Sequence, residues 1–452
     1  MIRKFRTADY EKTLELQIRL GDVLSPDHLA RFIVDVVAQL NLSKLYSQYS
    51  DQGAPPYAPE ILLGLLFYGY ATGVFSSRKV EKATYEVLPF RFIAGDMHPD
   101  HDTIATFRKQ FLNELKDLFV QILLIAQEMG HLQMGSVSLD GSKIHADASK
   151  SKAVSYKRLL AIEAYLQAEV NELFTLAEAA DGGQLPDEMN IPDEIERRKQ
   201  QLERLAEAKK VLEARAQAQY EAEKAEYDAK MQARAEKAAQ EGGKPPGRPP
   251  SPPTSGPRDK DQYNFTDPES RIMKNATNSG FDQHYNVQVV VEHDSRLVVG
   301  NWLCNHTNDK QAALPTIDTV PPTVGQLKKV NLDTGYFSEN NIAGLEKRGI
   351  DPYIATGRSP HHQGWRAFFL VNPDPPEEGA SIKEQMAYKL RTAIGNALYR
   401  LRKSTVEPVI GIIKEVLGFR QFSLRGLGAA GGEWTLVCLA YNLKRLHTLQ
   451  IG

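Results

Sequence analysis

The sequence predicts an α/β protein in which a mixed sheet is flanked by helices, with an all-helical N-terminal part and a helical hairpin inserted after the first strand. Residues 1–132 carry apolar side chains at helical spacing. After residue 133, strand-like runs alternate with helical segments, which indicates a sheet covered by helices. A long run rich in Ala, Glu, Lys, Arg and Gln separates the first strand from the others and predicts the hairpin. At 452 residues, the chain is also too long for one ordinary core, so more than one domain is expected.

Composition and charge restrict the class of protein. Hydrophobic residues make up 42% and charged residues 25% of the chain, as in soluble globular proteins. The longest apolar run, 61–70, falls short of the about 18 residues that span a bilayer, and the charged N-terminus does not resemble a signal peptide. Only Cys304 and Cys438 occur, which suits a reducing cytoplasm and argues against a cysteine metal site. Because the net charge is −2, any nucleic-acid binding would depend on local basic patches.

The N-terminal part, residues 1–132, is expected to be a helical bundle. Helices are predicted to start at Ser25–Pro26–Asp27, at Pro59, after Ser76, and at Thr103, which is expected to cap its helix. The helix that begins at Pro59 is apolar almost all round, which is typical of a helix buried in a core. Cations cluster in this part: Arg78, Lys79, Lys82, Arg91, Arg108 and Lys109. They suit a small DNA-binding module, but no clear helix-turn-helix signature is present, so a solvated charged face is an equal alternative.

The first strand is predicted over 135–144, where Val137 and Leu139 alternate with serines and lead into Asp140. Residues 153–258 are interpreted as an insertion. Helices are expected over 156–180 and 195–240, as an antiparallel hairpin or short coiled coil whose apolar repeat fades after Leu212. A Pro/Gly linker follows it.

The remaining strands are predicted from short β-rich runs. Two runs, 284–293 and 297–303, are separated by a turn and indicate a hairpin. Residues 307–309 are expected to cap a short helix, and the run 328–332 ends on Asp333. A last strand is expected near 352–356, followed by the C-terminal helices.

Three carboxylates stand out in this order of elements. Asp140 and Asp333 follow strands that can lie side by side, and Glu407 lies on a later helix among cations. Such a cup of carboxylates suits hard divalent cations, which prefer oxygen ligands and assist phosphodiester displacement in pairs about 3.5–4 Å apart. Asp333 and Glu407 also have plain structural interpretations: Asp333 would form a turn and Glu407 a surface ion pair. The competing acids are Asp147, Asp267, Asp309, Glu346 and Glu415, of which Glu415 is the strongest rival to Glu407.

Several motifs together resemble the bacterial insertion-sequence transposases of the DDE type, in the branch with an InsH-like N-terminal domain. They are YAPEILLGLLFYGYATGVFSSRKVEKA and HPDHDTIATFR in the N-terminal part, then SLDGSKIHADAS, NFTDPESRIMK, HYNVQ, NLDTGYFSENNI and RKSTVEPVIGIIKEVLGFRQFSLRG. The resemblance implies an RNase H-like fold and a catalytic, metal-binding triad of Asp140, Asp333 and Glu407. It also implies two Mg²⁺ ions, with Mn²⁺ as a substitute. The expected domains are a helical DNA-binding domain (1–132), a catalytic domain (133–152 with 259–452) and the insertion (153–258).

The family also carries a Tyr-x2-Arg-x3-Glu-x6-Lys signature, which implies roles for cations around Glu407. Tyr399 and Arg402 match its first interval, and Glu407 and Lys414 match its last. Four residues rather than three separate Arg402 from Glu407, and Lys403 stands at the family's spacing. The resemblance therefore implies DNA contacts from Tyr399, Arg402, Lys403 and Lys414.

The function implied is that of a transposase that binds the terminal inverted repeats of its element, cleaves double-stranded DNA there and transfers the 3′-OH ends to target DNA. Acting on two ends implies a homodimer or larger assembly on DNA, in the cytoplasm with the nucleoid and without a membrane partner. Two alternatives stay open at this point. One is an RNase H-like metal-dependent nuclease that does not join strands, and the other is a non-catalytic DNA-binding protein derived from a transposase.

Overall fold

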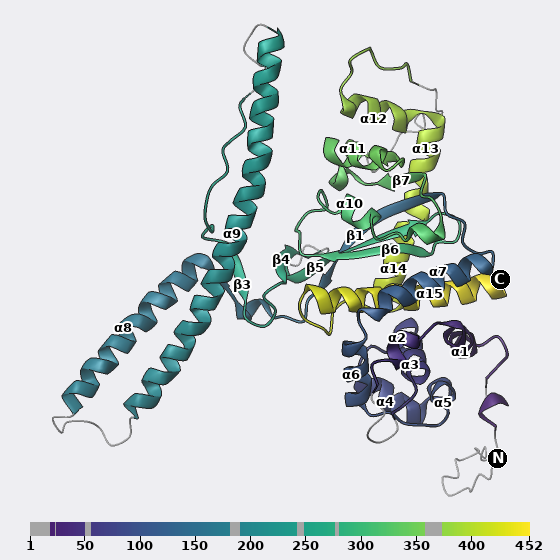
Figure 1. Ribbon diagram of the computed structural model, residues 1–452, viewed down its shortest axis with the longest axis horizontal. Coiled ribbons are helices and arrows are strands. Elements are labelled where there is room, and N and C mark those ends of the chain that lie inside the picture. Colours follow the sequence, from purple (N-terminus) through teal and green to yellow (C-terminus); the bar gives the residue numbers. More distant parts are fainter. Residues whose placement is uncertain are drawn as a thin grey trace, which may run out of the picture. The chain divides into compact units, whose positions relative to one another are not determined.

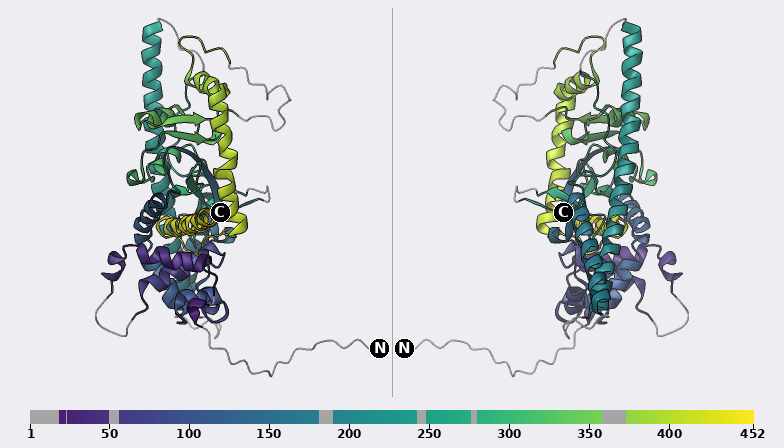
Figure 2. Two further views of the ribbon diagram at one scale, coloured as in Figure 1. Left: turned by 90° about the vertical axis from the view of Figure 1, so that its right-hand side faces the viewer. Right: turned by 90° about the vertical axis from the view of Figure 1, so that its left-hand side faces the viewer.

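The computed structural model describes residues 19–22, 24–49, 56–180, 190–241, 248–275, 280–357 and 373–452. The chain divides into two compact units (Figures 1 and 2). One unit consists of Met1–Ile144 together with Tyr285–Gly452, and the other is His145–His284. The predicted insertion, 153–258, lies within the second unit.

The N-terminal part of the first unit is helical, as predicted. Its elements are η1 (Leu20–Asp22), α1 (Leu29–Gln39), α2 (Ser43–Tyr46), α3 (Pro59–Ala71), α4 (Ser77–Glu86), α5 (Leu88–Ala94), α6 (His101–Gln110) and α7 (Glu114–Glu128). The predicted core helix is α3, which is buried from Leu62 to Ala71 because it is apolar on every side. Two predicted helix starts are wrong. His28 caps α1, and Asp100 caps α6 by accepting from the Thr103 N–H at 2.6 Å.

The last helix, α15 (Leu427–Ile451), packs against α1, α3 and α7 as well as against strand β6 (Val298–Cys304) (Figure 1). Glu433 of α15 is completely buried and accepts from the Tyr70 hydroxyl at 2.9 Å. Arg108 donates to the same tyrosine at 2.9 Å and lies 3.9 Å from Glu433. Arg108 is therefore part of a buried polar network and does not belong to the exposed basic cluster that the sequence suggested.

The mixed sheet has six strands, in the order β4-β5-β1-β7-β8, with β6 pairing β5 on the outside of this path. The strands are β1 (Ser136–His145), β4 (Arg271–Lys274), β5 (Phe281–Glu292), β6, β7 (Lys329–Leu332) and β8 (Asp351–Ile354). β5 and β6 form the predicted antiparallel hairpin, whereas β1, β7 and β8 run parallel. The start of β5 pairs with β4 inside the second unit. The combination of parallel and antiparallel strands confirms the predicted mixed sheet.

Helices and short turns connect or follow these strands. They are α10 (Ala313–Ile317), η3 (Pro322–Val324), η4 (Thr334–Tyr336), α11 (Glu339–Lys347), α12 (Ile382–Arg391), α13 (Ala393–Arg400), η6 (Leu401–Ser404), α14 (Val406–Gly411) and the π-helical turn η7 (Ile412–Val416). The predicted cap at 307–309 is wrong, since α10 begins only at Ala313. Ser338 caps α11 as expected, with its side chain accepting from the Asn341 N–H at 3.1 Å.

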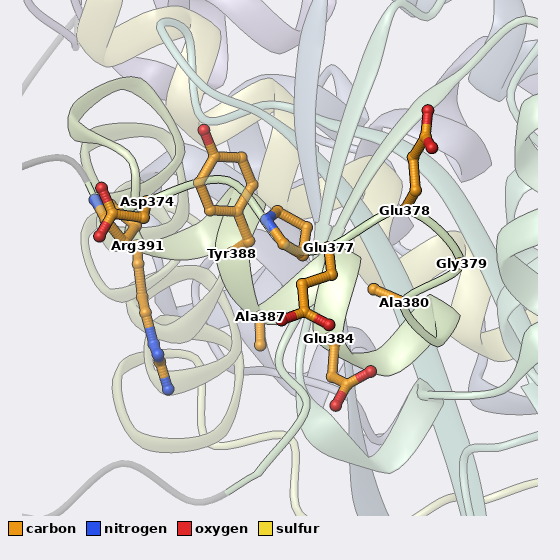
Figure 3. A pocket seen from close by; sticks show the side chains of 11 residues that line it. Asp374, Glu377, Glu378, Gly379, Ala380, Glu384, Ala387, Tyr388 and Arg391 are labelled. Carbon is orange, nitrogen blue, oxygen red and sulfur yellow. The ribbon is translucent and has the colours of Figure 1, made fainter.

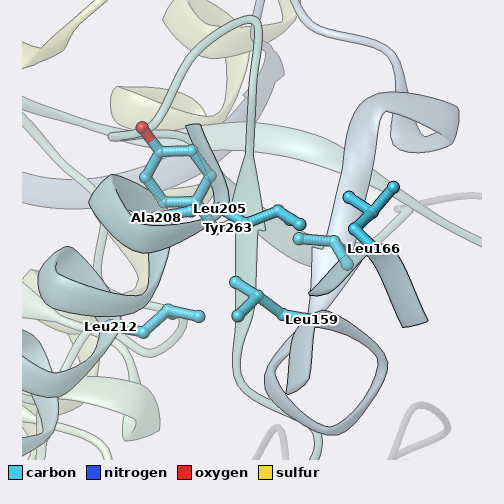
Figure 4. Close-up of a cluster of buried hydrophobic side chains, with 7 residues drawn as sticks. Leu159, Leu166, Leu205, Ala208, Leu212 and Tyr263 are labelled. Atoms are coloured by element: carbon cyan, nitrogen blue, oxygen red, sulfur yellow. The ribbon is translucent and has the colours of Figure 1, made fainter. Parts of the chain in front are cut away.

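The second unit is dominated by the predicted helical hairpin of α8 (Tyr156–Ala180) and α9 (Ile191–Glu241), which lie side by side in Figure 1. Beside them are η2 (Lys150–Lys152) and a two-stranded sheet of β2 (Ala153–Ser155) and β3 (Gln262–Asn264). Figure 4 shows the apolar cluster that joins these parts. The cluster consists of Val154, Leu159, Leu166, Leu205, Ala208, Leu212 and Tyr263.

The expected fading of the apolar repeat in α9 is confirmed, because the buried side chains described on this helix end at Ala216. Beyond that point the described part of α9 is stabilised by Glu–Lys and Glu–Gln pairs at helical spacing, such as Lys230 with Glu226. The first part of the predicted Pro/Gly linker, 242–247, lies outside the described residues, and 248–257 forms neither helix nor strand.

Candidate active site

Asp140 lies in the middle of β1, which continues to His145, so its predicted position near a strand end is corrected. Its side chain is 19% exposed, and its Oδ1 accepts from the Gly141 N–H at 2.8 Å. Gly141 must be small, because a β-carbon there would lie 2.3 Å from the Gln288 amide nitrogen. The strand alternation places the Gln288 side chain on the face of β1 opposite Asp140.

Asp333 follows β7 directly and lies at the same level of the sheet as Asp140. β1 and β7 are parallel neighbours with Ser138 opposite Asn331, so two residues further along each strand bring Asp140 and Asp333 together on one face. Asp333 caps the turn η4, where its Oδ1 accepts from the Gly335 N–H at 2.7 Å. Parallel pairing therefore explains how two aspartates almost 200 positions apart in sequence come to the same level and face of the sheet.

The segment α13–η6–α14 covers this same face. The Asn331 amide donates to the Leu398 carbonyl at 2.7 Å, and the buried Thr405 hydroxyl donates to Ser138 at 3.0 Å. Ser138 and Asn331 are the residues that precede the two aspartates on that face. These two hydrogen bonds hold the segment that carries Arg402 and Glu407 over Asp140 and Asp333.

Arg402 links the carboxylates. Its Nη1 donates to Asp140 Oδ2 at 2.9 Å and its Nη2 donates to Glu407 Oε1 at 3.0 Å. The extra residue between Arg402 and Glu407 is accommodated by a break in the helix: the chain leaves the tight turn η6, adopts φ −114° and ψ −83° at Thr405, and begins α14 at Val406. Because of this break, both side chains reach the same site despite their altered spacing.

The other predicted contacts differ in their surroundings. Tyr399 is half-buried beside Arg402, and burial raises the pKa of its hydroxyl. Lys414 donates to the Ser142 hydroxyl of β1 at 3.1 Å, and burial lowers the pKa of its ammonium group. Lys403 is exposed. Glu415, the rival of Glu407, pairs with Arg420 at the surface.

Electrostatics sets Asp140 apart from an ordinary aspartate. Burial is the main cause that raises the pKa of its carboxyl group to about 6, although Arg402 and the Gly141 N–H act in the opposite direction. The negative charges of Asp333 and Asp309 raise it further. The site therefore holds more negative charge than the Arg402 guanidinium balances.

Asp309 is a site neighbour that sequence reasoning named only as a competing acid and as a helix cap. It follows β6 and accepts from the side chains of Asn286 and Gln288. A signal was available in the second half of β5, where Asn286 and Gln288 alternate with valines and are buried polar side chains that need partners.

The residues of the site meet some of the requirements of a divalent cation. Carboxylate oxygens are the donors that Mg²⁺ and Mn²⁺ prefer, and the uncompensated negative charge around Asp140 would favour a cation. With Arg402 between Asp140 and Glu407, no group of three His, Cys, Asp or Glu side chains among the described residues is spaced to hold an ion directly. The site thus fits a divalent cation in donor type and charge. In this arrangement, the positively charged guanidinium of Arg402 lies between the carboxylates of Asp140 and Glu407.

A separate pocket lies beside α12, lined by residues 373–391 (Figure 3). Its side chains include Glu377, Glu378 and Glu384, and none of the predicted site residues lines it. Acidic walls disfavour a phosphate backbone. We therefore do not assign the DNA site to this pocket.

Comparison with known families gives two matches. A model described as a transposase domain (DUF772) matches residues 18–110, and a model described as a transposase DDE domain matches residues 258–443. The second range contains Asp333 and Glu407, whereas Asp140 lies between the two ranges. A DDE domain is consistent with an RNase H-like fold, in agreement with the mixed sheet and its helices. Searches of curated proteins and of solved structures found no match.

Among the described residues, no helix is long and apolar enough to cross a membrane.

Proposed function

Because the chain belongs to the insertion-sequence DDE transposases, we propose that it cuts DNA at the terminal inverted repeats of its element and joins the freed 3′-OH ends to target DNA. The observation that carries this proposal is the register of β1 and β7, which brings Asp140 and Asp333 to one level beneath Glu407 and Arg402. Strand cleavage and joining use the same phosphodiester chemistry, so one site serves both steps.

Asp140, Asp333 and Glu407 would hold the divalent cations, two Mg²⁺ ions with Mn²⁺ as a substitute. Bound there, such ions supply activation of the attacking oxygen and stabilisation of the leaving oxygen. Arg402 is the residue that must release Asp140 and Glu407, and its freed guanidinium can then bind a phosphate through two parallel hydrogen bonds. The half-buried Tyr399 orients Arg402 from the side.

Lys414 and Lys403 would bind the DNA backbone on either side of the cut. Lys414 reaches the site from η7 and lies against Ser142, whereas Lys403 projects from η6 into solvent. Lysine acts as a point charge toward phosphate, so these contacts position DNA without reading its sequence.

The domains would divide the remaining tasks. We propose that residues 1–132 read the terminal repeats, that 133–152 with 259–452 form the catalytic domain, and that the hairpin within 153–258 serves assembly. Exposed cations on α4, among them Arg78, Lys79 and Lys82, support DNA binding by the N-terminal helices. The protein would act as a homodimer or larger assembly on the two ends of the element, in the cytoplasm with the nucleoid.

The test is Asp140→Asn with labelled DNA that carries one end of the element. The variant should lose detectable nicking and strand joining in Mg²⁺ while it still shifts end DNA in a gel, because the change removes a ligand and leaves the N-terminal helices intact. Glu415→Gln is the matched control and should cleave like the wild type, since Glu415 pairs with Arg420 at the surface. Unchanged cleavage by Asp140→Asn would refute the triad, and cleavage without joined products in the wild type would indicate a nuclease.

A further inference from the structure

Asp309 is held rigidly by buried amides. Its Oδ1 accepts from the side chain of Asn286 at 2.8 Å and from that of Gln288 at 2.9 Å. Gln288 is fully buried and Asn286 is 3% exposed. The two amides also bond to each other at 3.0 Å. A carboxylate fixed by two such donors has one defined orientation before any ligand arrives.

The same network reaches residues close in sequence to both Asp140 and Asp333. The hydroxyl of Tyr336, a fully buried residue three positions after Asp333, donates to the side-chain amide oxygen of Gln288. The Gln288 amide also lies against Gly141, next to Asp140. The network therefore connects strand β1 beside Asp140, and the turn η4 that follows Asp333, to the carboxylate of Asp309.

The second oxygen of Asp309 faces the turn after β7. A β-carbon at Gly335 would lie 3.0 Å from Asp333 Oδ1 and 3.6 Å from Asp309 Oδ2. The two carboxylates thus approach the same glycine, which leaves the space beside it free of a side chain. Two carboxylates on the same glycine concentrate negative charge there, which a bound cation would balance.

We propose that Asp309 is a fourth acidic residue of the cation site and contributes its negative charge to divalent-cation binding beside Asp333. The inference rests on the proposed function, since it adds a residue to the same site. Cation affinity for oxygen sites increases with the number of charged ligands, so a fourth carboxylate strengthens the site.

The competing explanation is that Asp309 only locks the segment between β6 and α10. Asp309→Asn separates the two, because an asparagine carbonyl oxygen can accept from the same two amides and only the charge is lost. A structural role would leave cation binding unchanged. A role in cation binding would weaken it while leaving the fold intact.

The experiment is a Mn²⁺ titration of the full-length protein, followed by electron paramagnetic resonance of the free ion at pH 7.5. Asp309→Asn should weaken Mn²⁺ binding about tenfold or more, as for other supporting residues of metal sites, and Asp309→Glu should recover part of the affinity. Asp318→Asn is the matched control, since Asp318 pairs with Arg348 at the surface, and it should bind like the wild type.

The outcomes distinguish this inference from the proposed function. If Asp140→Asn abolishes Mn²⁺ binding while Asp309→Asn binds like the wild type, the role of Asp309 is refuted and the triad stands. If the wild type does not bind Mn²⁺, or Asp140→Asn binds it unchanged, both the cation site and the role of Asp309 are refuted.

Discussion

Asp140→Asn should stabilise the folded protein at neutral pH, although it should abolish cleavage. Burial and the neighbouring acids raise the pKa of the Asp140 carboxyl group in the folded state. An acid whose pKa is raised on folding binds its proton more tightly in the folded state. The stability from this proton is complete below the ordinary pKa and is lost as the pH rises to the folded-state pKa.

The size of the effect follows from the two pKa values. The pKa of Asp140 rises from 3.8 to about 6, and each pH unit between them is worth about 1.4 kcal/mol, so about 3 kcal/mol is lost by pH 7.5. At pH 4.5, only about 1 kcal/mol is lost, because the carboxyl group is still protonated when folded. The attraction of Arg402 is already contained in the folded-state pKa. The asparagine carries no charge, so the variant should gain up to about 3 kcal/mol at pH 7.5 and about 1 kcal/mol at pH 4.5.

The assay is urea unfolding at both pH values in the presence of EDTA, followed by tryptophan fluorescence. Trp302 and Trp434 lie in the same unit as Asp140, so their signal reports on that unit, whereas Trp365 lies outside the described residues. Asp318→Asn serves as the control and should show no gain at pH 7.5. A variant Asp140→Asn that is no more stable than the wild type at pH 7.5, or whose gain is the same at both pH values, would refute the electrostatic argument.

Two further predictions concern buried contacts. Glu433→Gln should lower the free energy of unfolding by about 3 kcal/mol or more, because it leaves the buried Arg108 without its counter-charge; urea unfolding checks this, and a loss below about 1 kcal/mol would contradict it. Gly141→Ala should force the Gln288 side chain to move, since the added carbon would lie 2.3 Å from its amide nitrogen, and should cost about 1–3 kcal/mol in the same assay. If Gly141→Ala were as stable as the wild type, the present position of the Gln288 side chain would not contribute to the free energy of unfolding.

Local patterns were sufficient for the individual elements. The β5–β6 hairpin follows from two apolar runs around a short turn, and the helix over 156–180 follows from its apolar spacing. The position of Asp333 directly after a strand could be predicted because the β-rich run before it ends at Leu332. These predictions hold because the periodicity of apolar side chains is a property of the chain itself.

Other features could not be predicted because they depend on distant partners. Arg108 looked like one more surface cation, yet Glu433 holds it in the core, and the sequence separates these two by more than 300 positions. Asp309 looked like a helix cap, yet it accepts from two amides of β5. A buried charged group needs a partner, and tertiary packing brings that partner from a distant segment, so the local sequence does not reveal it.

The alternating strands and helices, the inserted hairpin and the motifs typical of DDE transposases could all be recognised without a structure. The tertiary structure alone decided how the acids meet. The parallel register of β1 and β7 brings Asp140 level with Asp333, and the helix break at Thr405 lets Arg402 reach both Asp140 and Glu407 across an interval one residue longer than expected. Register and helix breaks are set by hydrogen bonds between segments far apart in the chain, and for that reason only the folded structure shows the arrangement of charge at the site.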